Sequence, residues 1–336
     1  MKAPRIGVAL GGGGARGWAH VGALRALDEV GLAPDVIAGT SMGAAVAAAY
    51  AAGKLDEFEE WALALDRRGL IGLFDLSFQG GLIGAHRVFD ELSEILPDID
   101  IEELPMPFGA VATDLEHGTA VRLVEGSLRT ALRASVAIPG LISPIQVGGR
   151  WVVDGGLVDP VPVGLVRALG AEVVIAVELS ANRSIAPQLT PFLEPPTAEM
   201  PKIEPPPGAS TLASADALPP EEGAEDDAVG TPSFFDHLGD LTERFWSQLR
   251  PAERPVIPDP PPSVYEVISQ SLYIMQVRIA RSVLAGEPPD LHVVPRLQSV
   301  QLMDFDKAEE AIEEGARAVR TALAAQADFH LKDPAK

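Results

Sequence analysis

The sequence contains no cysteine, and this absence removes several kinds of chemistry at once. Disulfide bonds, thiol nucleophiles and cysteine-ligated metal sites are all excluded. Proteins without disulfides are typical of reducing compartments. We therefore expect a cytoplasmic protein, either free or in peripheral contact with a membrane.

Long apolar runs and basic residues are scarce as well. No stretch reaches the roughly 18 strongly apolar residues that a membrane-spanning helix requires. Lysine and arginine together number 26 against 48 aspartates and glutamates, which gives a formal net charge of −22. Such a charge repels phosphate backbones, so we expect no nucleic-acid partner and no simple electrostatic docking onto anionic lipid.

Apolar residues make up 47% of the 336 positions, which is enough for a sizeable buried core. Short apolar runs alternate with segments of helical spacing, and this alternation predicts an α/β fold with a mostly parallel sheet. The expected strands span 6–10, 35–38, 108–113, 119–124, 144–147, 150–153, 172–178 and 291–294. The expected helices span 18–30, 42–52, 55–65, 128–136, 163–169, 264–284 and 307–323.

One long segment breaks this alternation. Residues 187–262 hold 17 of the 30 prolines and 14 acidic residues against 4 basic ones, a composition typical of disordered chains. Within them, 234–249 places aromatic and leucine side chains on one helical face, as a lid, a lipid-binding element or a packed core helix would. We expect a catalytic core over 1–185, an acidic insertion over 186–262, and a return to the core domain over 263–327.

A glycine-rich loop, GGGGARG at Gly11–Gly17, follows the first expected strand. A dinucleotide-binding loop would need an acidic ribose ligand at the end of the next strand, and a P-loop would need Lys-Ser/Thr where Trp18 stands. A tight turn would explain one or two glycines but not four in succession. The favoured interpretation is an oxyanion site made by backbone N–H groups at a helix start, with Arg16 adding charge or bracing the loop.

The second expected strand ends in GTSMG, residues Gly39–Gly43, with Ser41 at the centre. A Gly-x-Ser-x-Gly between a strand and a helix is typical of a nucleophile elbow, which exposes the serine hydroxyl on a strained turn. The amide of Met42 would then lie beside the oxyanion. The same five residues also fit a packing turn of small side chains, because glycine-rich sequences match the pattern by chance.

A serine nucleophile usually takes its base from histidine. His20 lies in the first turn after the glycine loop, where bracing the loop is the favoured role. Asp154, in VVDGGLVDPVP, is the better candidate because two glycines follow it and a carboxylate can accept the serine proton. Asp-Gly is equally a turn dipeptide. The other histidines stand in loops or in and beyond the acidic segment: His86, His117, His237, His292 and His330.

Taken in order, GGGGARG, GTSMG and the DGG of Asp154–Gly156 resemble the motifs of the patatin-like phospholipase family. VATDLEHG (Val111–Gly118), ASVAIPG (Ala134–Gly140) and DGGLVDPVPV (Asp154–Val163) resemble segments of its bacterial members. The tail that begins at Leu291 resembles their C-terminal helical part. Each motif alone is common, but the ordered set is specific and covers roughly residues 5–180 and 262–325.

The resemblance implies a three-layer α/β/α fold and a lipid acyl hydrolase that needs no catalytic histidine, cofactor or metal. Ser41 would attack the acyl carbonyl of a lipid or other ester substrate, and Asp154 would act as the base. The oxyanion hole would comprise Gly12, Gly13, Gly14, Arg16 and Met42. The supporting motif positions would be Gly17, Gly39, Gly43, Gly155 and Gly156.

Many members of that family have an asparagine near the position of Asp159. Here this residue could add negative charge close to the site, but we expect a solvated loop carboxylate. Two functions of different classes stay open: an acyl hydrolase, and a non-catalytic member of the fold that binds acyl chains or a protein partner. The joint presence of Ser41, Asp154 and the glycine loop favours the hydrolase. A nucleotide-binding module is disfavoured because its ligand residues are missing.

Overall fold

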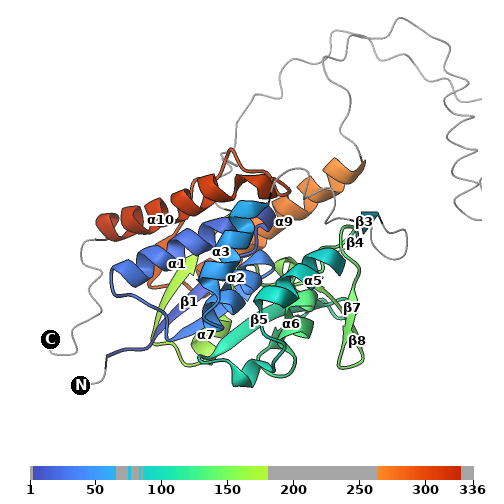
Figure 1. Ribbon diagram of the computed structural model, residues 1–336, viewed down its shortest axis with the longest axis horizontal. Coiled ribbons are helices and arrows are strands. Elements are labelled where there is room, and N and C mark those ends of the chain that lie inside the picture. Colours follow the sequence, from blue (N-terminus) through green and yellow to red (C-terminus); the bar gives the residue numbers. More distant parts are fainter. Residues whose placement is uncertain (1–2, 66–74, 77–82, 85, 181–263, 327–336) are drawn as a thin grey trace, which may run out of the picture. The chain divides into compact units, whose positions relative to one another are not determined.

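The computed structural model describes residues 3–65, 75–76, 83–84, 86–180 and 264–326 (Figure 1). The segment expected to be an acidic insertion, 186–262, and its expected helix at 234–249 lie outside the described residues. The division of the chain into a core, an insertion and a returning segment therefore stays a prediction.

The strands are β1 (Ile6–Leu10), β2 (Val36–Thr40), β3 (Asp75–Leu76), β4 (Ile83–Gly84), β5 (Phe108–Asp114), β6 (Ala120–Leu123), β7 (Ile145–Val147), β8 (Arg150–Asp154), β9 (Val173–Val177) and β10 (Leu291–Val293). The α-helices are α1 (Ala19–Glu29), α2 (Met42–Ala51), α3 (Leu55–Ala64), α5 (His86–Ile95), α6 (Leu128–Ser135), α7 (Val163–Ala168), α9 (Val264–Gly286) and α10 (Ala308–Ala325). Short 3-10 turns are η1 (Gly14–Trp18), η2 (Ile101–Glu103), η3 (Gly155–Leu157) and η4 (Phe305–Lys307).

The apolar pattern located these elements well. Every expected strand and helix that falls within the described residues is present, with ends that agree to within about two residues. The pattern did not predict α5, the short β3–β4 pair or the 3-10 turns.

The main sheet has the strand order β10-β9-β1-β2-β5-β8-β7, and β6 also pairs with β5. The strands from β10 to β5 pair in parallel, whereas β6, β7 and β8 pair antiparallel. The expectation of a mostly parallel sheet is therefore confirmed. Parallel strands are buried on both faces, which explains why β1, β2 and β5 are buried along their whole length and are mostly apolar.

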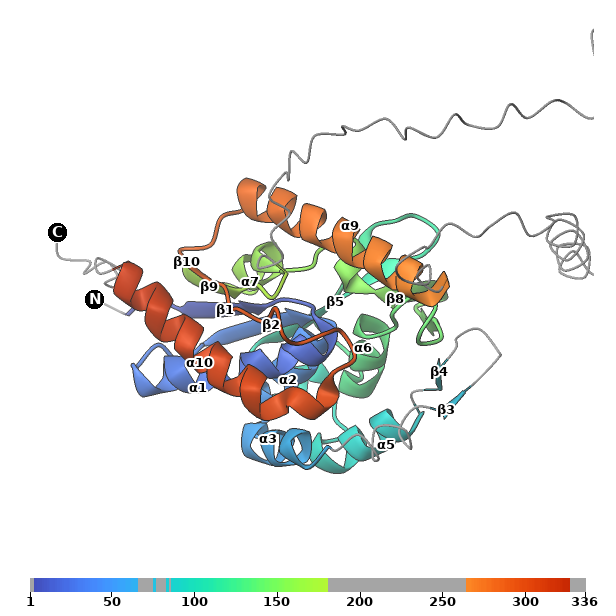
Figure 2. The same ribbon diagram turned by 90° about the horizontal axis from the view of Figure 1, so that it is seen from above.

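Helices cover both faces of this sheet and give three layers (Figure 2). On one face, Val8 and Leu10 of β1 belong to a core that includes residues of α1, α2, α6 and α10. On the other face, Ala9 packs with residues of α7 and with Ala280 of α9. The three-layer α/β/α architecture is confirmed, and its parallel strands end at the edge where the glycine loop, Ser41 and Glu178 follow.

The returning C-terminal segment is tied to the N-terminal one by a very close helix crossing. Glycines stand where α1 meets α10: a Cβ atom built on Gly22 would lie 1.8 Å from the carbonyl oxygen of Ile312, and one on Gly315 would lie 1.8 Å from that of Ala19. Only glycine leaves room for the two backbones at this separation. The chain between β10 and α10 is thereby held beside the glycine loop.

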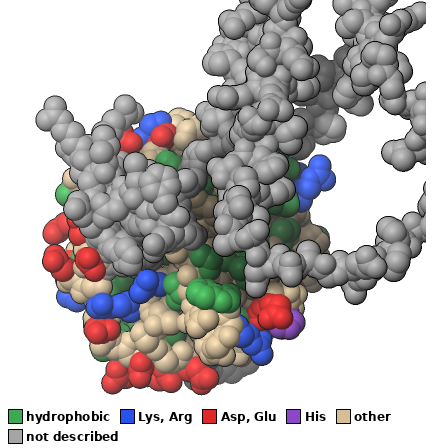
Figure 3. All heavy atoms as spheres, turned by 90° about the vertical axis from the view of Figure 1, so that its right-hand side faces the viewer, with side chains coloured by type: hydrophobic (Ala, Val, Ile, Leu, Met, Phe, Trp, Pro, Cys, Tyr) green, Lys and Arg blue, Asp and Glu red, His purple; other side chains and the backbone are tan. Residues whose placement is uncertain are grey.

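Figure 3 views the end of the molecule where β7 and β8 lie, and shows hydrophobic side chains gathered near the middle of this face and acidic ones along its lower margin. The large apolar side chains that are at least 40% exposed include Leu115 in the β5–β6 turn, Trp151 in β8, and four on α9: Val267, Ile268, Ile274 and Met275.

Candidate active site

Ser41 occupies a strained turn between β2 and α2. Its φ of 56° makes it the one non-glycine residue with positive φ in the described part of the chain. Such a conformation is costly for a residue with a Cβ and persists where the surroundings enforce it. Here the backbone N–H of Ser41 donates a 2.9 Å hydrogen bond to the hydroxyl of Ser135, so the turn is fixed from outside.

The glycines on either side of Ser41 are required by close backbone contacts. A Cβ on Gly39 would lie 2.2 Å from the carbonyl oxygen of Gly43, and a Cβ on Gly43 would lie 2.3 Å from that of Leu10. Both distances are far below van der Waals contact. The pentapeptide therefore has the strand–turn–helix geometry expected of a nucleophile elbow.

Asp154 ends β8 and is 1% exposed. Its Oδ1 accepts a 2.7 Å hydrogen bond from the N–H of Gly156, the same contact that caps η3. Burial raises the pKa of Asp154 to about 6, although hydrogen bonds from Ser41 and Gly156 lower it. A carboxylate with this pKa is ionised at neutral pH and is a stronger base than a solvated one.

The sheet register explains why Ser41 and Asp154 meet. Along β5, Val111 pairs with Thr40 of β2 and the next residue, Ala112, pairs with Asp154 of β8. Because β6 pairs with the same stretch of β5, it occupies the opposite edge, and β2 and β8 must share the remaining one. The two strand ends therefore face each other along β5 and bring the serine and the carboxylate together.

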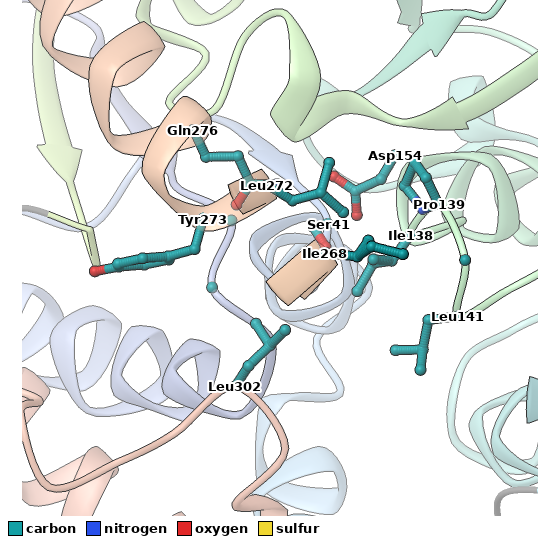
Figure 4. A pocket seen from close by; sticks show the side chains of 14 residues that line it. Ser41, Ile138, Pro139, Leu141, Asp154, Ile268, Leu272, Tyr273, Gln276 and Leu302 are labelled. Atoms are coloured by element: carbon teal, nitrogen blue, oxygen red, sulfur yellow. The ribbon is translucent and has the colours of Figure 1, made fainter. Parts of the chain in front are cut away.

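Ser41 interacts with the Asp154 carboxylate, and this interaction lowers the pKa of the acid. The second carboxylate oxygen, Oδ2, is buried without a well-aligned hydrogen bond from any described residue. The Ser41–Asp154 contact is therefore long or bent rather than ideal. Figure 4 shows the two side chains together in the wall of one pocket.

The glycine loop lies beside Ser41 and offers free amides. The N–H of Gly12 donates to the carbonyl of Pro160 at 3.0 Å and is engaged. In the described part of the chain, no hydrogen bond uses the N–H groups of Gly13 or Gly14. Met42 begins α2, so its N–H has no intrahelical partner either. These three amides are the donors that the arrangement leaves for an oxyanion.

Arg16 is placed to brace the loop rather than to line the pocket. Its Nε donates to the carbonyl of Val300 at 2.9 Å, and its guanidinium carbon lies 4.7 Å from the centre of the Tyr273 ring. Leu302 adds a second tie, because its carbonyl accepts a 2.9 Å hydrogen bond from the N–H of Ala15. The loop is thus held by residues that precede α10.

The remaining expected motif glycines allow close packing around these groups. A Cβ on Gly17 would lie 2.2 Å from Cγ of Met42, and one on Gly155 would lie 2.3 Å from the carbonyl oxygen of Val111. A Cβ on Gly156 would lie 2.6 Å from Nε2 of Gln276.

His20 is fully buried, and its Nε2 donates a 2.7 Å hydrogen bond to the carbonyl of Gly11. Burial lowers the pKa of His20 to about 4, although the Gly11 contact raises it. The imidazole is therefore neutral at physiological pH and supports the start of the glycine loop. This is the bracing role that the sequence favoured over catalysis.

Asp159 was expected to be a solvated loop carboxylate, and this expectation is wrong. Its Oδ1 is buried and unpartnered in the described structure, and burial raises the pKa of Asp159 to about 6. Arg122 lowers that pKa and Glu287 raises it. The residue is drawn inward because Thr40 donates its hydroxyl hydrogen to the Asp159 carbonyl and the Asp159 N–H donates to Gly155.

A cavity of about 310 Å³ opens over these groups (Figure 4). Its floor is formed by Gly12–Gly14, Ser41 and Asp154. Its apolar walls are contributed by distant segments: Ile138, Pro139, Leu141, Ile268, Leu272 and Leu302. The volume is at the lower end of the range for small-molecule pockets, roughly 300–1,000 Å³.

Several residues around this site were not found from the sequence. Ser135 holds the elbow, and Tyr273 and Gln276 enter the cavity wall from α9. The ASVAIPG segment contains Ser135 and was recognised as a motif, but nothing in its local pattern indicates which backbone group the hydroxyl meets. Helical spacing alone also does not reveal which turn of α9 crosses the pocket.

Comparison with known proteins identifies a matching family and several relatives. The model of the family described as patatin-like phospholipase matches residues 8–167. The chain is 36% identical to an uncharacterized NTE family protein of Mycobacterium bovis over 97% of this chain and 92% of that protein. It is 35% identical to patatin-like phospholipase domain-containing protein 7 of Mus musculus, over 53% of this chain and 14% of that one. Among solved structures, VipD from Legionella pneumophila aligns with a TM-score of 0.44 and 13% identity, over 97% of this chain and 67% of VipD.

The chain belongs to the patatin-like phospholipase family, a family of lipid hydrolases. The resemblance drawn from the sequence motifs is confirmed. In the described segments no helix is long and apolar enough to cross a membrane. Within the same residues, no group of three or more histidine and carboxylate side chains is gathered so that it could hold a metal ion.

Proposed function

We propose that this protein is a serine acyl hydrolase of lipid esters that works with a Ser41–Asp154 dyad. The observation that carries the proposal is the placement of a strained serine next to a buried carboxylate of raised pKa, both in the wall of an apolar cavity. A strained elbow and a perturbed acid in one pocket are typical of a catalytic site rather than of a packing turn.

In the proposed acylation step, Ser41 Oγ attacks the ester carbonyl carbon and its proton passes to Asp154. The negative charge that develops on the carbonyl oxygen is stabilised by the amides of Gly13, Gly14 and Met42. Collapse of the tetrahedral intermediate breaks the bond to the leaving alcohol, which takes the proton from Asp154. The products of this step are the free alcohol and an acyl ester on Ser41.

The cavity favours one acyl chain with its ester carbonyl. Of the described residues that line it, none is lysine or arginine, and apart from Tyr273 and Gln276 the walls are aliphatic. A phosphate group would find no cation there and would meet the Asp154 carboxylate. We therefore infer that the acyl chain enters the cavity and that any polar headgroup stays outside.

We also infer that lipid reaches the site past α9. Ile268 lines the cavity and is nevertheless 48% exposed, so one apolar side chain connects the pocket wall with the surface. Val267 and Met275 of the same helix are 49% and 48% exposed. Burial of such side chains at a lipid surface would be favourable without any basic patch.

A fluorophosphonate probe tests the hydrolase directly, because it forms a covalent bond only with an activated serine. We expect labelling of the wild-type protein, no labelling of Ser41→Ala, and a rate of labelling lowered by about 10²–10⁴-fold in Asp154→Asn. Ser127→Ala, which removes an exposed hydroxyl at the start of α6, is the matched control and should label normally. Absence of labelling in folded wild-type protein would refute the proposal and favour a non-catalytic member of the family.

A further inference from the structure

Gln276 brings a neutral amide from α9 to the edge of the dyad (Figure 4). A Cβ atom built on Gly156 would lie 2.6 Å from Gln276 Nε2 and 2.9 Å from Asp154 Oδ1. The two polar atoms therefore cannot be farther apart than the sum of these distances. That spacing is short enough for a single water molecule to hydrogen-bond to both.

Both groups have hydrogen-bonding capacity left. Asp154 Oδ1 accepts one N–H, from Gly156, and a carboxylate oxygen has room for a second donor. The Gln276 amide makes no hydrogen bond to other described residues. The cavity wall around it is otherwise largely apolar, with Leu272 and Ile268 one and two turns earlier on the same helix and Tyr273 beside them. An amide in such a wall is suited to hold a polar molecule in a fixed place.

Resting on the hydrolase function proposed above, we propose that Gln276 and Asp154 together position the water that hydrolyses the acyl-enzyme. After acylation, Asp154 has released its proton to the leaving alcohol and is a base again. A water molecule that accepts a hydrogen bond from the Gln276 amide and donates one to Asp154 keeps its other lone pair for attack.

Deacylation then proceeds in two stages, and Asp154 carries the proton between them. The water oxygen bonds to the carbonyl carbon of the Ser41 ester while one water proton passes to Asp154. The intermediate collapses by breaking the bond between that carbon and Ser41 Oγ, and Oγ takes the proton back from Asp154. The product is a free carboxylic acid, and the dyad returns to its starting state. Gln276 acts on the water alone, so acylation does not require it.

A role in deacylation alone predicts a different result from a role in which Gln276 only packs against Gly156. Gln276→Leu keeps a similar volume and removes the amide. We expect acylation of Ser41 to change by less than about 2-fold and deacylation to fall by roughly 10-fold, the effect of one lost hydrogen bond. Gln270→Leu is the matched control, because Gln270 lies on α9, is exposed, and is not among the residues that line the cavity.

Rapid-quench reactions with enzyme in excess over a p-nitrophenyl ester measure both steps in one experiment. Release of p-nitrophenol reports acylation, and appearance of the free acid reports deacylation. Accumulation of the acyl adduct on intact Gln276→Leu protein, with a normal rate of fluorophosphonate labelling, is the expected result. Equal loss in both steps, or no change in either, would overturn the role of Gln276. Failure of wild-type labelling would instead overturn the hydrolase function itself.

Discussion

The hydroxyl of Ser135 accepts a 2.9 Å hydrogen bond from the backbone N–H of Ser41, and both residues are buried. Ser135 is the last residue of α6, so the end of one helix fixes the conformation of the elbow that begins another. This contact compensates for part of the backbone strain at Ser41.

Removal of the Ser135 hydroxyl should therefore lower activity by more than the accompanying loss of folding stability would. We expect Ser135→Ala to lower kcat/KM by roughly 10-fold and the free energy of unfolding by about 1–2 kcal/mol, because a buried N–H loses its acceptor. Ser127→Ala, at the other end of α6, removes a helix cap and should cost about 1 kcal/mol with normal kcat/KM. Equal losses of activity in the two variants would show that Ser135 does not position the elbow.

The pH dependence of acylation should follow the Asp154 carboxylate. Because burial raises its pKa to about 6, the base form is lost as the pH falls through 6. We expect kcat/KM for a neutral ester to be constant above about pH 7 and to fall about tenfold per pH unit below 6. Stopped-flow assays from pH 4.5 to 8.5 measure this profile.

Asp159 provides the control for that profile, since burial raises its pKa to about 6 as well. It is not among the described residues that line the cavity. Asp159→Asn should therefore leave the apparent pKa of kcat/KM unchanged. If the pH profile flattens in Asp159→Asn, the titrating group is Asp159 and not Asp154.

Replacement of the proposed base should stabilise the fold. The pKa of Asp154 is higher in the folded state than its ordinary value of 3.8, so its ionised form destabilises the fold above about pH 6, and the penalty disappears below about pH 4. We expect Asp154→Asn to raise the free energy of unfolding at pH 8 by up to about 3 kcal/mol and to have little effect at pH 4. Urea titrations at both pH values test this, and a loss of stability at pH 8 would contradict it.

The residues that local pattern could identify were those whose role depends on their immediate neighbours. Ser41 stands in a five-residue turn whose glycines, strand and helix are all contiguous, and Asp154 ends a strand just before two glycines. Ser135 and Gln276 act across the fold, and their contacts depend on the register of β2 and β8 along β5 and on the path of α9. No local spacing encodes those relationships.

Two features were not predicted correctly from the sequence: the burial of Asp159 and the helix α5. Asp159 lies in a proline-flanked turn, a context that usually indicates exposure, but a long-range hydrogen bond from Thr40 and a local one to Gly155 draw it inward. The helix α5, with the sequence HRVFDELSEI, follows Gly84-Ala85 without a Ser, Thr, Asp or Asn cap, so the usual start signal is missing.

His20 should be dispensable for chemistry but important for the loop. Its Nε2–H donates to Gly11, and glutamine can supply an equivalent donor. We expect His20→Gln to keep activity within about tenfold of wild type, whereas His20→Leu should lose about 1–3 kcal/mol of stability because the carbonyl loses its donor. Loss of turnover in His20→Gln, with activity retained in Asp154→Asn, would overturn the proposed dyad.

The same histidine predicts a loss of stability in acid. Burial lowers the pKa of His20 to about 4, below its ordinary value of 6.5, so the unfolded chain binds this proton more readily than the folded one. His20 therefore lowers the free energy of unfolding as the pH falls from about 6.5 towards 4, opposite in sign to the contribution of Asp154. Relative to wild type, His20→Gln should become more stable as the pH falls through that window in urea titrations, and a constant difference between the two proteins would assign the acid sensitivity to other groups.

The crossing of α1 and α10 connects fold stability with the site. Substitution of valine at Gly22 would force its Cβ against the carbonyl of Ile312 and separate the helices, at a cost of at least about 1–3 kcal/mol. The residues just before α10 hold the glycine loop, because the carbonyls of Val300 and Leu302 accept hydrogen bonds from Arg16 and Ala15. A displaced α10 should therefore also disturb the amides of Gly13 and Gly14.

We consequently expect Gly22→Val to lower both the melting temperature and the rate of fluorophosphonate labelling of the protein that remains folded. Gly286→Ala is the matched control, because a Cβ at Gly286, the last residue of α9, meets nothing within 4 Å. That control should leave both measurements unchanged. If Gly22→Val unfolds at a lower temperature but labels at the wild-type rate below it, the glycine loop keeps its geometry without the α1–α10 contact, and the ties from Val300 and Leu302 are sufficient by themselves.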